Sequence, residues 1–259
     1  MSLFWISFWT LAIIFQLSSI TTTLYLHRGM THRSVKFHPV IAFLMRVQIW
    51  LATGQVPLYW VAVHRKHHQF TDVEGDPHSP RLKGLWHVFF LNPVYTNVEG
   101  SKPETVAKYA KDIPRGRADV ILNNSLLGLG SGIAIIFSFF LLVSEAVWVG
   151  ALAASVVLVA HMVLYIISTS TINAICHMIG ARNFENTATN IRSISMITVG
   201  ESLHNNHHED PFSPKMSVYR WEIDPVWPLI QLLCLLRLAE RLPSINEKRG
   251  ISNYAKGVL

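Results

Sequence analysis

Charged side chains are scarce in this chain of 259 residues. Asp, Glu, Lys and Arg together make up 15% of the sequence, whereas half of the residues are hydrophobic. A soluble domain usually has about 25% charged residues. This deficit argues against an ordinary water-soluble enzyme and predicts an integral membrane protein. At this length we expect one compact unit.

Cysteine is almost absent too. The only two cysteines, Cys176 and Cys234, lie in or beside apolar segments, which excludes a disulfide framework as the basis of the fold. The sequence also has no internal repeats, no low-complexity tract and no nucleic-acid-binding motif to accompany its net charge of +6. Basic loops on the cytoplasmic side of a membrane protein account for that charge. We therefore expect no nucleic-acid partner.

Long apolar runs are what the sequence does contain. Three of them, at about residues 3–26, 126–143 and 147–175, are long enough to cross a hydrocarbon core of about 30 Å. The first run has no basic segment before it and no cleavage-site pattern after it, unlike a secretory signal peptide. The sequence thus predicts an all-α integral membrane protein with about three transmembrane helices.

Two further apolar stretches are predicted to lie at the membrane surface. Residues 39–63 contain Arg46, and a charge in the middle of a span costs about 2.5–3.5 kcal/mol on insertion scales. An interfacial or shallow re-entrant helix avoids this cost. Residues 225–239 are short for a span and suit an amphipathic surface helix. Residues 71–125 are polar and are expected to form a few short helices at most.

Histidines gather in three short runs, which hold eight of the thirteen in the chain. The runs contain His27 and His32, then His64, His67 and His68, then His204, His207 and His208. In the second and third runs the spacing is i, i+3, i+4, which places three rings on one face of a helix. A ninth histidine, His177, ends the third apolar run and follows Asn173 by one helical turn.

The order of spans and histidine runs predicts that all nine rings meet on one side of the membrane. One span precedes the first two runs, and a hairpin of two spans separates them from the third. The loops on that side hold nearly all of the Lys and Arg, which predicts the cytoplasmic side. We therefore expect a cytosolic cap, formed by residues 27–125 and 176–259, within a single membrane domain covering residues 1–259.

Nine histidines are too many for one ion, since structural zinc takes four protein ligands and catalytic zinc three. They suit two ions with four or five protein ligands each, so the cap is predicted to be a histidine-rich di-metal cap. Imidazole binds Fe, Cu, Zn and Ni alike, which leaves the metal open. Nearby carboxylates that accept the other ring N–H would orient the histidines. We assign this role to Asp76, Glu201 and Asp210, and expect surface or hydrogen-bonded roles for His38, His78, His87 and His161.

The three runs resemble the histidine boxes of the membrane fatty acid desaturases. They read His27-Arg28-Gly29-Met30-Thr31-His32, His64-Arg65-Lys66-His67-His68 and His204-Asn205-Asn206-His207-His208. Asp76-Pro77-His78-Ser79-Pro80, and Asn173 with His177 ahead of Gly180-Ala181-Arg182-Asn183-Phe184, are similar to the Δ9 acyl-CoA (stearoyl-CoA-like) branch. With three spans, the chain looks like the bacterial members of this branch.

The resemblance implies two iron ions held by the nine histidines, with Asn173 binding through a water molecule. It also implies O2 as co-substrate and removal of two hydrogens from a CH2–CH2 unit to give a cis double bond, at Δ9. The substrate would be an acyl-CoA or a phospholipid-linked acyl chain, and no catalytic residue is implied beyond the metal centre. Electrons would come from a separate ferredoxin, rubredoxin or cytochrome b5 type protein with its reductase. A bacterial cytoplasmic (inner) membrane is the expected location.

Two other functions fit parts of the pattern. Membrane di-iron hydroxylases and monooxygenases share the three-box plan but add a hydroxyl group. A histidine-rich metal transporter or sensor is the remote alternative, and it would need ligands along a path through the membrane. For a desaturase, we expect a bulky residue deep in the first span, such as Phe15 or Leu11, to set the accepted chain length.

Overall fold

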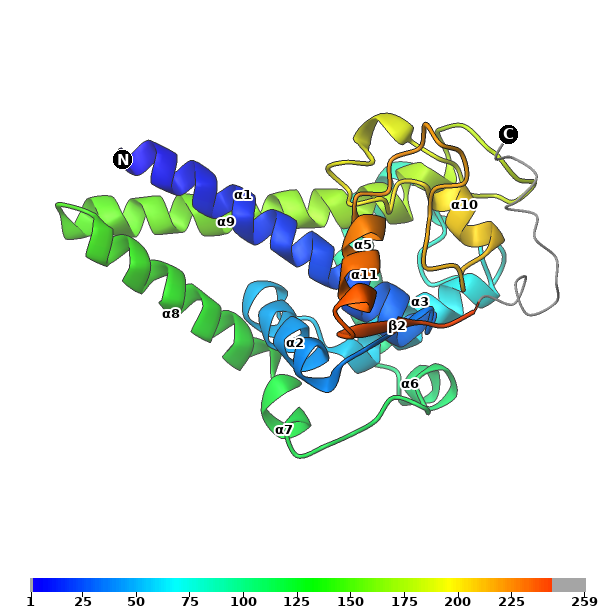
Figure 1. The fold of residues 1–259 in the computed structure, drawn as a ribbon, viewed down its shortest axis with the longest axis horizontal. Coiled ribbons are helices and arrows are strands. Elements are labelled where there is room, and N and C mark those ends of the chain that lie inside the picture. Colours follow the sequence, from blue (N-terminus) through cyan, green and yellow to red (C-terminus); the bar gives the residue numbers. More distant parts are fainter. Residues whose placement is uncertain (1, 244–259) are drawn as a thin grey trace.

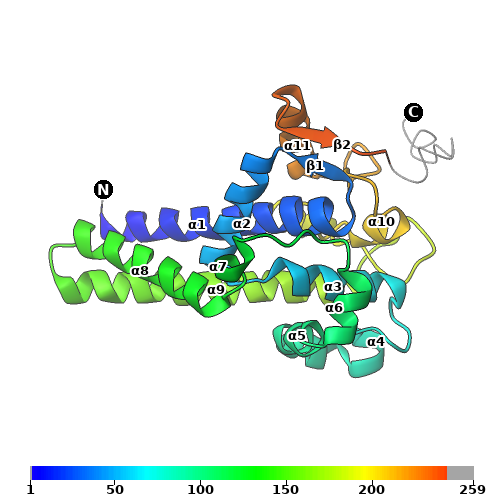
Figure 2. The same ribbon diagram turned by 90° about the horizontal axis from the view of Figure 1, so that it is seen from below.

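Three long apolar helices lie side by side in the computed structural model, which describes residues 2–243 (Figures 1 and 2). They are α1 (Leu3–Thr21), α8 (Ser125–Val143) and α9 (Val147–Asn173). With their continuations, the segments Leu3–Thr31, Ser125–Val143 and Val147–His177 are long and apolar enough to cross a membrane. The predicted fold class, a helical membrane protein with about three spans, is confirmed. The part of the predicted cap beyond residue 243 lies outside the described residues.

The first span does not stop at Leu26 but runs into the first histidine run as a π-helix, η1 (Thr22–Thr31). Its wider turn is visible in the hydrogen bond from the His32 backbone N–H to the His27 carbonyl, at 3.1 Å. Thr31 Oγ1 donates to the Leu26 carbonyl in the same way, five residues back. Bonding from i to i+5 brings residues five apart onto one side of the helix, and such segments are frequent at functional sites. This explains why the first pair of histidines is spaced by five.

The second apolar stretch is a bent pair of helices, α2 (Pro39–Thr53) and α3 (Pro57–Gln69), whose axes differ by 90°. Gly54 ends α2 with a φ of 63°, a left-handed conformation that glycine adopts without strain. Pro57 then starts α3 at a position where its missing N–H costs nothing. Arg46 on α2 is paired with Asp119, as an interfacial position allows. The bend delivers the second histidine run to the cap.

The remaining elements are short and belong mostly to the cap. They are β1 (Val35–Phe37), α4 (Pro80–Lys83), α5 (Leu85–Gly100), α6 (Pro103–Tyr109), α7 (Asp119–Leu122), η2 (Ile175–His177), η3 (Arg192–Ile194), α10 (His204–Glu209), α11 (Val226–Leu235) and β2 (Ala239–Arg241). The strands β1 and β2 pair antiparallel, with Val35 opposite Arg241. The expectation of a few short helices for residues 71–125 is wrong at α5, which has 16 residues.

Small residues let the helices approach closely inside the bundle. A Cβ added at Gly132 of α8 would lie 2.1 Å from the Leu51 carbonyl of α2, and one at Gly150 of α9 would lie 2.7 Å from the Phe140 carbonyl of α8. Close packing through glycine is typical of helices in lipid, where apolar burial alone gives little driving force. The bundle thereby holds the cap ends of α1 and α9 at a fixed separation. In Figure 1, α10 lies at that end of the molecule, and the N-terminus lies at the other.

Candidate metal centre

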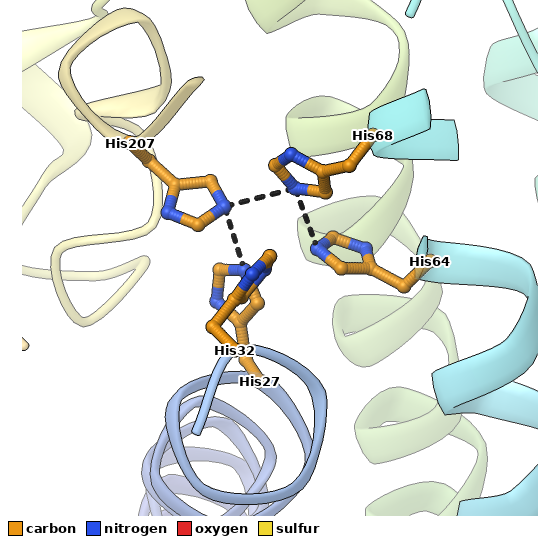
Figure 3. Close-up of side chains that lie close together, drawn as sticks. All are labelled: His27, His32, His64, His68 and His207. Carbon is orange, nitrogen blue, oxygen red and sulfur yellow. Dashed lines mark hydrogen bonds between the residues drawn. The ribbon is translucent and has the colours of Figure 1, made fainter. Parts of the chain in front are cut away.

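The nine histidines singled out from the sequence lie in two adjacent groups. The first group, called site A here, contains His27, His32, His64, His68 and His207. The second group, called site B, contains His67, His177, His204 and His208. Within each group, one ring nitrogen from every histidine lies within 4.8 Å of the others. Figure 3 shows the five rings of site A turned toward one another from three separate segments.

Two helices supply ligands to both groups. On α3, His64 and His68 face site A while His67 faces site B. On α10, His207 faces site A while His204 and His208 face site B. The i, i+3, i+4 spacing makes this division possible, because three rings on one helical face fan out over two neighbouring positions. The two sites are therefore coupled through these two helices.

The ring nitrogens are spaced as ligands of one ion would be. In site A, His207 Nε2 lies 3.0 Å from both His27 Nε2 and His68 Nε2. In site B, His204 Nε2 lies 3.0 Å from both His177 Nε2 and His208 Nε2. Two imidazole ligands at about 2.0–2.1 Å from a metal ion, at a right angle to each other, are separated by about 3 Å. The donor set fits a metal ion in each group.

Three carboxylates fix the tautomers of three ligand histidines. Glu201 Oε2 lies 2.7 Å from His27 Nδ1, and Asp76 Oδ2 lies 3.0 Å from His67 Nδ1. Asp72 Oδ2 lies 2.9 Å from His177 Nδ1. A carboxylate at Nδ1 keeps the proton there and leaves the Nε2 lone pair for a metal.

The Nε2 atom of His67 is a clear case of an orphaned ligand atom. His67 is fully buried, and its Nε2 has no hydrogen-bond partner within the described part of the chain. A buried polar atom without a partner costs about 1–3 kcal/mol. A metal ion in site B would satisfy this atom.

Most of the ligand histidines are held in the neutral form that a metal requires. Burial, and after it the repulsion between neighbouring histidines, keeps the pKa well below the ordinary 6.5 in six of them: His32, His64, His68, His204, His207 and His208. Nine imidazoles in contact cannot all carry protons, so the uncharged rings present lone pairs to the centre. Metal binding then needs little proton release from these groups.

The carboxylates remain charged although they are buried or, for Glu201, mostly buried. Burial alone would raise the pKa of Asp76, but attraction to His67 and its hydrogen bond lower it to about 2. Burial likewise opposes ionisation of Asp72 and Glu201, yet the contacts with His177 and His27 outweigh it and the pKa of each lies below its usual value. Three negative charges thus surround two groups of neutral ligands, which favours cations between them.

The structure places the other predicted site residues as follows. Asn173 is the last residue of α9, and its Nδ2 donates to Asn92 Oδ1 at 3.0 Å. It lines a cavity together with His27 and His64 of site A. Asp210 is buried directly after α10, where its backbone N–H donates to the Asn206 carbonyl.

Asp72 is the main residue that sequence reasoning passed over. It lies four residues before Asp76 in the loop after α3, and its side chain also accepts from Ser79 Oγ. Its φ of 60° is unusual for a residue other than glycine. Proximity to the second histidine run was the available signal, but nothing in the spacing assigns Asp72 to a histidine 105 residues away.

His78 differs from its expected surface or hydrogen-bonded role. It is 2% exposed, its ring stacks on His67 at 4.8 Å between centroids, and neither ring nitrogen has a partner within residues 2–243. Burial lowers its pKa to about 3. A neutral ring packed against His67 restricts the orientation of that ligand.

Residues far from α10 in the sequence hold this six-residue helix in place. Its N-cap, Leu203, has no capping side chain. Asn190 Oδ1 takes that role from another loop, accepting the backbone N–H groups of Asn205 and Asn206 at 2.9 and 3.4 Å. Such N–H groups at a helix start otherwise lack partners.

The asparagines between the histidines form the opposite face of α10. Asn206 donates to Glu222 and to the Met216 carbonyl, at 2.8 and 2.9 Å, and accepts from Asn183 and Asn190. Asn205 is fully buried and hydrogen-bonded to the loop at residues 183–188. The third histidine run thus has one face for metal and one face that anchors it.

Two hollows reach site A through different histidines. A cavity of about 70 Å³ between α1, η1, α3 and α9 is lined by Trp60 and by His27 and His64. It also touches Tyr165, whose hydroxyl lies 2.7 Å from Thr22 Oγ1. The residues that line it do not include Phe15 or Leu11. An open basin of about 1210 Å³ in the cap is lined by His32, His68 and His208.

Comparison with known proteins gives consistent matches over nearly the whole chain. The family model described as fatty acid desaturase matches residues 3–240. An acyl-CoA C20 Δ5-desaturase from Anemone leveillei is 32% identical over 262 residues, covering 96% of this chain and 78% of the relative. Delta-9 acyl-lipid desaturase 2 from Arabidopsis thaliana is 28% identical, with 96% and 79% covered. An sn-2 palmitoyl-lipid 9-desaturase from Nostoc sp. (strain 36) is 33% identical, with 87% and 77% covered.

Proposed function

Because the chain belongs to the fatty acid desaturase family, we propose that it is an O2-dependent fatty acyl desaturase of a membrane. It would insert a cis double bond, at Δ9, into a saturated chain carried by CoA or by a phospholipid. The names of the relatives, which act on acyl-CoA and on acyl lipids, support this substrate class. The observation that carries the proposal is the pair of histidine groups beside a cavity between two spans.

Two iron ions are the proposed occupants of sites A and B. When bound, they would supply the redox chemistry by which O2, two electrons and two protons remove two hydrogens from a CH2–CH2 unit and yield two water molecules. The nine histidines would hold the ions, and Asp72, Asp76 and Glu201 would orient three of the rings. We keep Asn173 as a ligand through water, since it lines the cavity beside site A.

The acyl chain is proposed to enter the cavity beside site A from the bilayer. The cavity lies between α1 and α9, so a chain in it would pass His27, His64 and the ring of Trp60, which stacks on His64 at 4.7 Å. An apolar chain needs a hollow that excludes water and fixes one bond near the metal. At about 70 Å³ the cavity must widen as the chain enters.

Tyr165 is the proposed end of the chain-binding space. On α9 it is the lining residue deepest in the span, two turns before Asn173, and its bond to Thr22 closes the gap to η1. An apolar groove of about 610 Å³ between α1, α2, α8 and α9 begins beyond it, at His161 and Met162. An acyl chain whose end reaches Tyr165 would therefore not extend into this groove.

Electrons would arrive from a separate donor protein at the basin in the cap. Three ligand histidines, His32, His68 and His208, line this basin, and none of them lines the membrane cavity. A ferredoxin, rubredoxin or cytochrome b5 type protein with its reductase is the proposed donor class. The proposed location is a bacterial cytoplasmic membrane with the histidine groups on the cytoplasmic side, where the basic loops would lie.

Expression in a host that lacks fatty acid desaturase activity tests the proposal. Wild type would run beside His207→Ala, with fatty acids analysed by gas chromatography and the double bond located by derivatisation. New cis-monounsaturated chains from the wild type alone are the expected result. A well-expressed wild type that yields no new unsaturated species defeats the proposal, and hydroxylated chains in their place identify a hydroxylase.

A further inference from the structure

Helix α5 carries an apolar stripe that no part of the described chain covers. Trp86, Phe90 and Val94 follow each other at intervals of four, and Val98 continues the row. Their side chains are 62%, 70%, 53% and 57% exposed in that order. A helix of a soluble cap would turn such a stripe toward the core. Here the stripe is turned outward.

The other face of α5 is packed against the protein. Val88, Asn92 and Glu99 are buried, and the helix contacts α3, α4, α6 and α9. Asn92 Oδ1 accepts from Nδ2 of Asn173, the last residue of α9. The position of α5 is therefore fixed relative to the cap end of a span.

The length of α9 sets the level of α5 relative to a bilayer. Its 27 residues extend over about 40 Å at 1.5 Å per residue, whereas a hydrocarbon core is about 30 Å thick. The last turns of α9, where Asn92 is attached, lie beside the histidine groups of the cap, so the excess length is expected to extend at this end into the headgroup region. In Figure 2, α5 runs across the direction of the spans at their cap end, with α4 and α6 on the side away from them.

The chemistry of the stripe suits this level. Tryptophan and other aromatic residues are enriched at the boundary between lipid and water, and lysine side chains extend from there to the headgroups. Lys83 lies next to the start of α5, with its Nζ 5.1 Å above the Tyr95 ring. The interfacial helix α2 also exposes apolar side chains, Phe43 at 52% and Leu44 at 57%.

We propose that α5 is a membrane-interface helix, whose stripe of Trp86, Phe90, Val94 and Val98 is buried in the bilayer leaflet next to the cap. The partner of this surface is lipid, not a protein. Asn92 is hydrogen-bonded to Asn173 beside site A, so the depth of α5 in the lipid also sets the position of Asn173. This placement of α5 rests on the three spans and not on the proposed reaction.

Site-directed spin labelling of the full chain tests the placement. Cys234→Ser removes the partly exposed cysteine, and Cys176 is fully buried. Labels would be attached at Phe90→Cys, at Ile135→Cys on the lipid-facing side of α8, and at Glu185→Cys in an exposed loop of the cap. The protein would be placed in phosphatidylcholine–phosphatidylglycerol nanodiscs with one chain per disc. The measurement is collision of each label with O2, which concentrates in lipid, and with a water-soluble nickel chelate.

The label at residue 90 is expected to collide with O2 more than with the chelate, as at Ile135. Preference for the chelate in nanodiscs, as at Glu185, overturns the proposal. Protection from both reagents that appears only when two chains share a disc also overturns it, because a second copy then covers the stripe. Val94→Cys repeats the measurement if Phe90→Cys does not fold.

Discussion

Sites A and B have similar ligands but different surroundings. Site A has five histidines from three segments, and one carboxylate, Glu201, contacts one of its rings. Site B has four histidines, and two of them are fixed by Asp72 and Asp76 from a single loop. The cavity between α1 and α9 touches site A and not site B.

This difference indicates that the two sites would have different roles in the reaction. Site B has two buried carboxylates and the ring of His78 against its histidines, so its ion would be held with little freedom although His208 borders the basin. Site A has more histidines but only one carboxylate in contact with them. It also borders the space proposed for the acyl chain. An ion that must accommodate substrate and oxygen benefits from adjustable ligands, and a rigid neighbour keeps its position defined.

Removal of one ligand from each site should have the largest effect. His207→Ala acts on site A and His204→Ala on site B, and each should lose one ion and abolish desaturation, because the reaction needs both. The checks are iron per chain by elemental analysis and product by gas chromatography. His87→Ala, an exposed histidine outside both sites, is the matched control. Full activity of either ligand variant would show that its site is dispensable.

Removal of a carboxylate that contacts a ligand ring should lower the metal affinity of one site only, and by less than removal of the ligand itself. Glu201→Gln should weaken only site A, and Asp72→Asn only site B, by about 10–100-fold in metal affinity each. Titration of the metal-free protein with Fe(II) under anaerobic conditions measures the two affinities. Equal weakening of both sites by either variant would contradict the separation drawn between them.

The cap on α10 should affect both sites together, because that helix serves both. Asn190→Ala removes the acceptor for two backbone N–H groups and should cost about 1 kcal/mol, or about fivefold in affinity at each site. Asn190→Asp keeps the acceptor but loses the donor to Asn206 Oδ1, so it should retain only part of the affinity. The same titration gives both values, and a loss confined to one site would show that α10 does not couple them.

The smallest effect is expected at the end of the cavity beside site A. Tyr165→Ala opens the cavity toward the apolar groove and should shift the products toward longer chains. Tyr165→Phe loses only the bond to Thr22, worth about 1 kcal/mol, and should leave the profile nearly unchanged. Fatty acid profiling of both variants is the check. If Tyr165→Ala leaves the product profile unchanged, Tyr165 does not form the end of the space that binds the acyl chain.

Local spacing made much of this arrangement predictable. The i, i+3, i+4 pattern of His64, His67 and His68 defines a helical face, and the order of spans and loops brings the three runs to one level. Apolar length predicted three spans, and the comparisons confirm the family. These features depend on residues close together in the sequence, where helical geometry decides.

Contacts between segments far apart in the sequence could not be predicted from local spacing. The π-helical turn that aligns His27 with His32 depends on bonds whose register the composition does not reveal. Asp72 meets His177 across 105 residues, and Asn190 caps a helix in another segment. Helix α5 was missed because its apolar start is short and Pro93, a residue type that usually ends a helix, lies inside it.

Mössbauer spectroscopy of protein loaded with 57Fe(II) tests the central claim, two unequal iron sites in one chain. The account predicts two ions per chain and two signals of equal area, of which Glu201→Gln alters one and leaves the other. One ion or fewer per chain at saturating iron, or a single signal that changes as a whole in the variant, would contradict it.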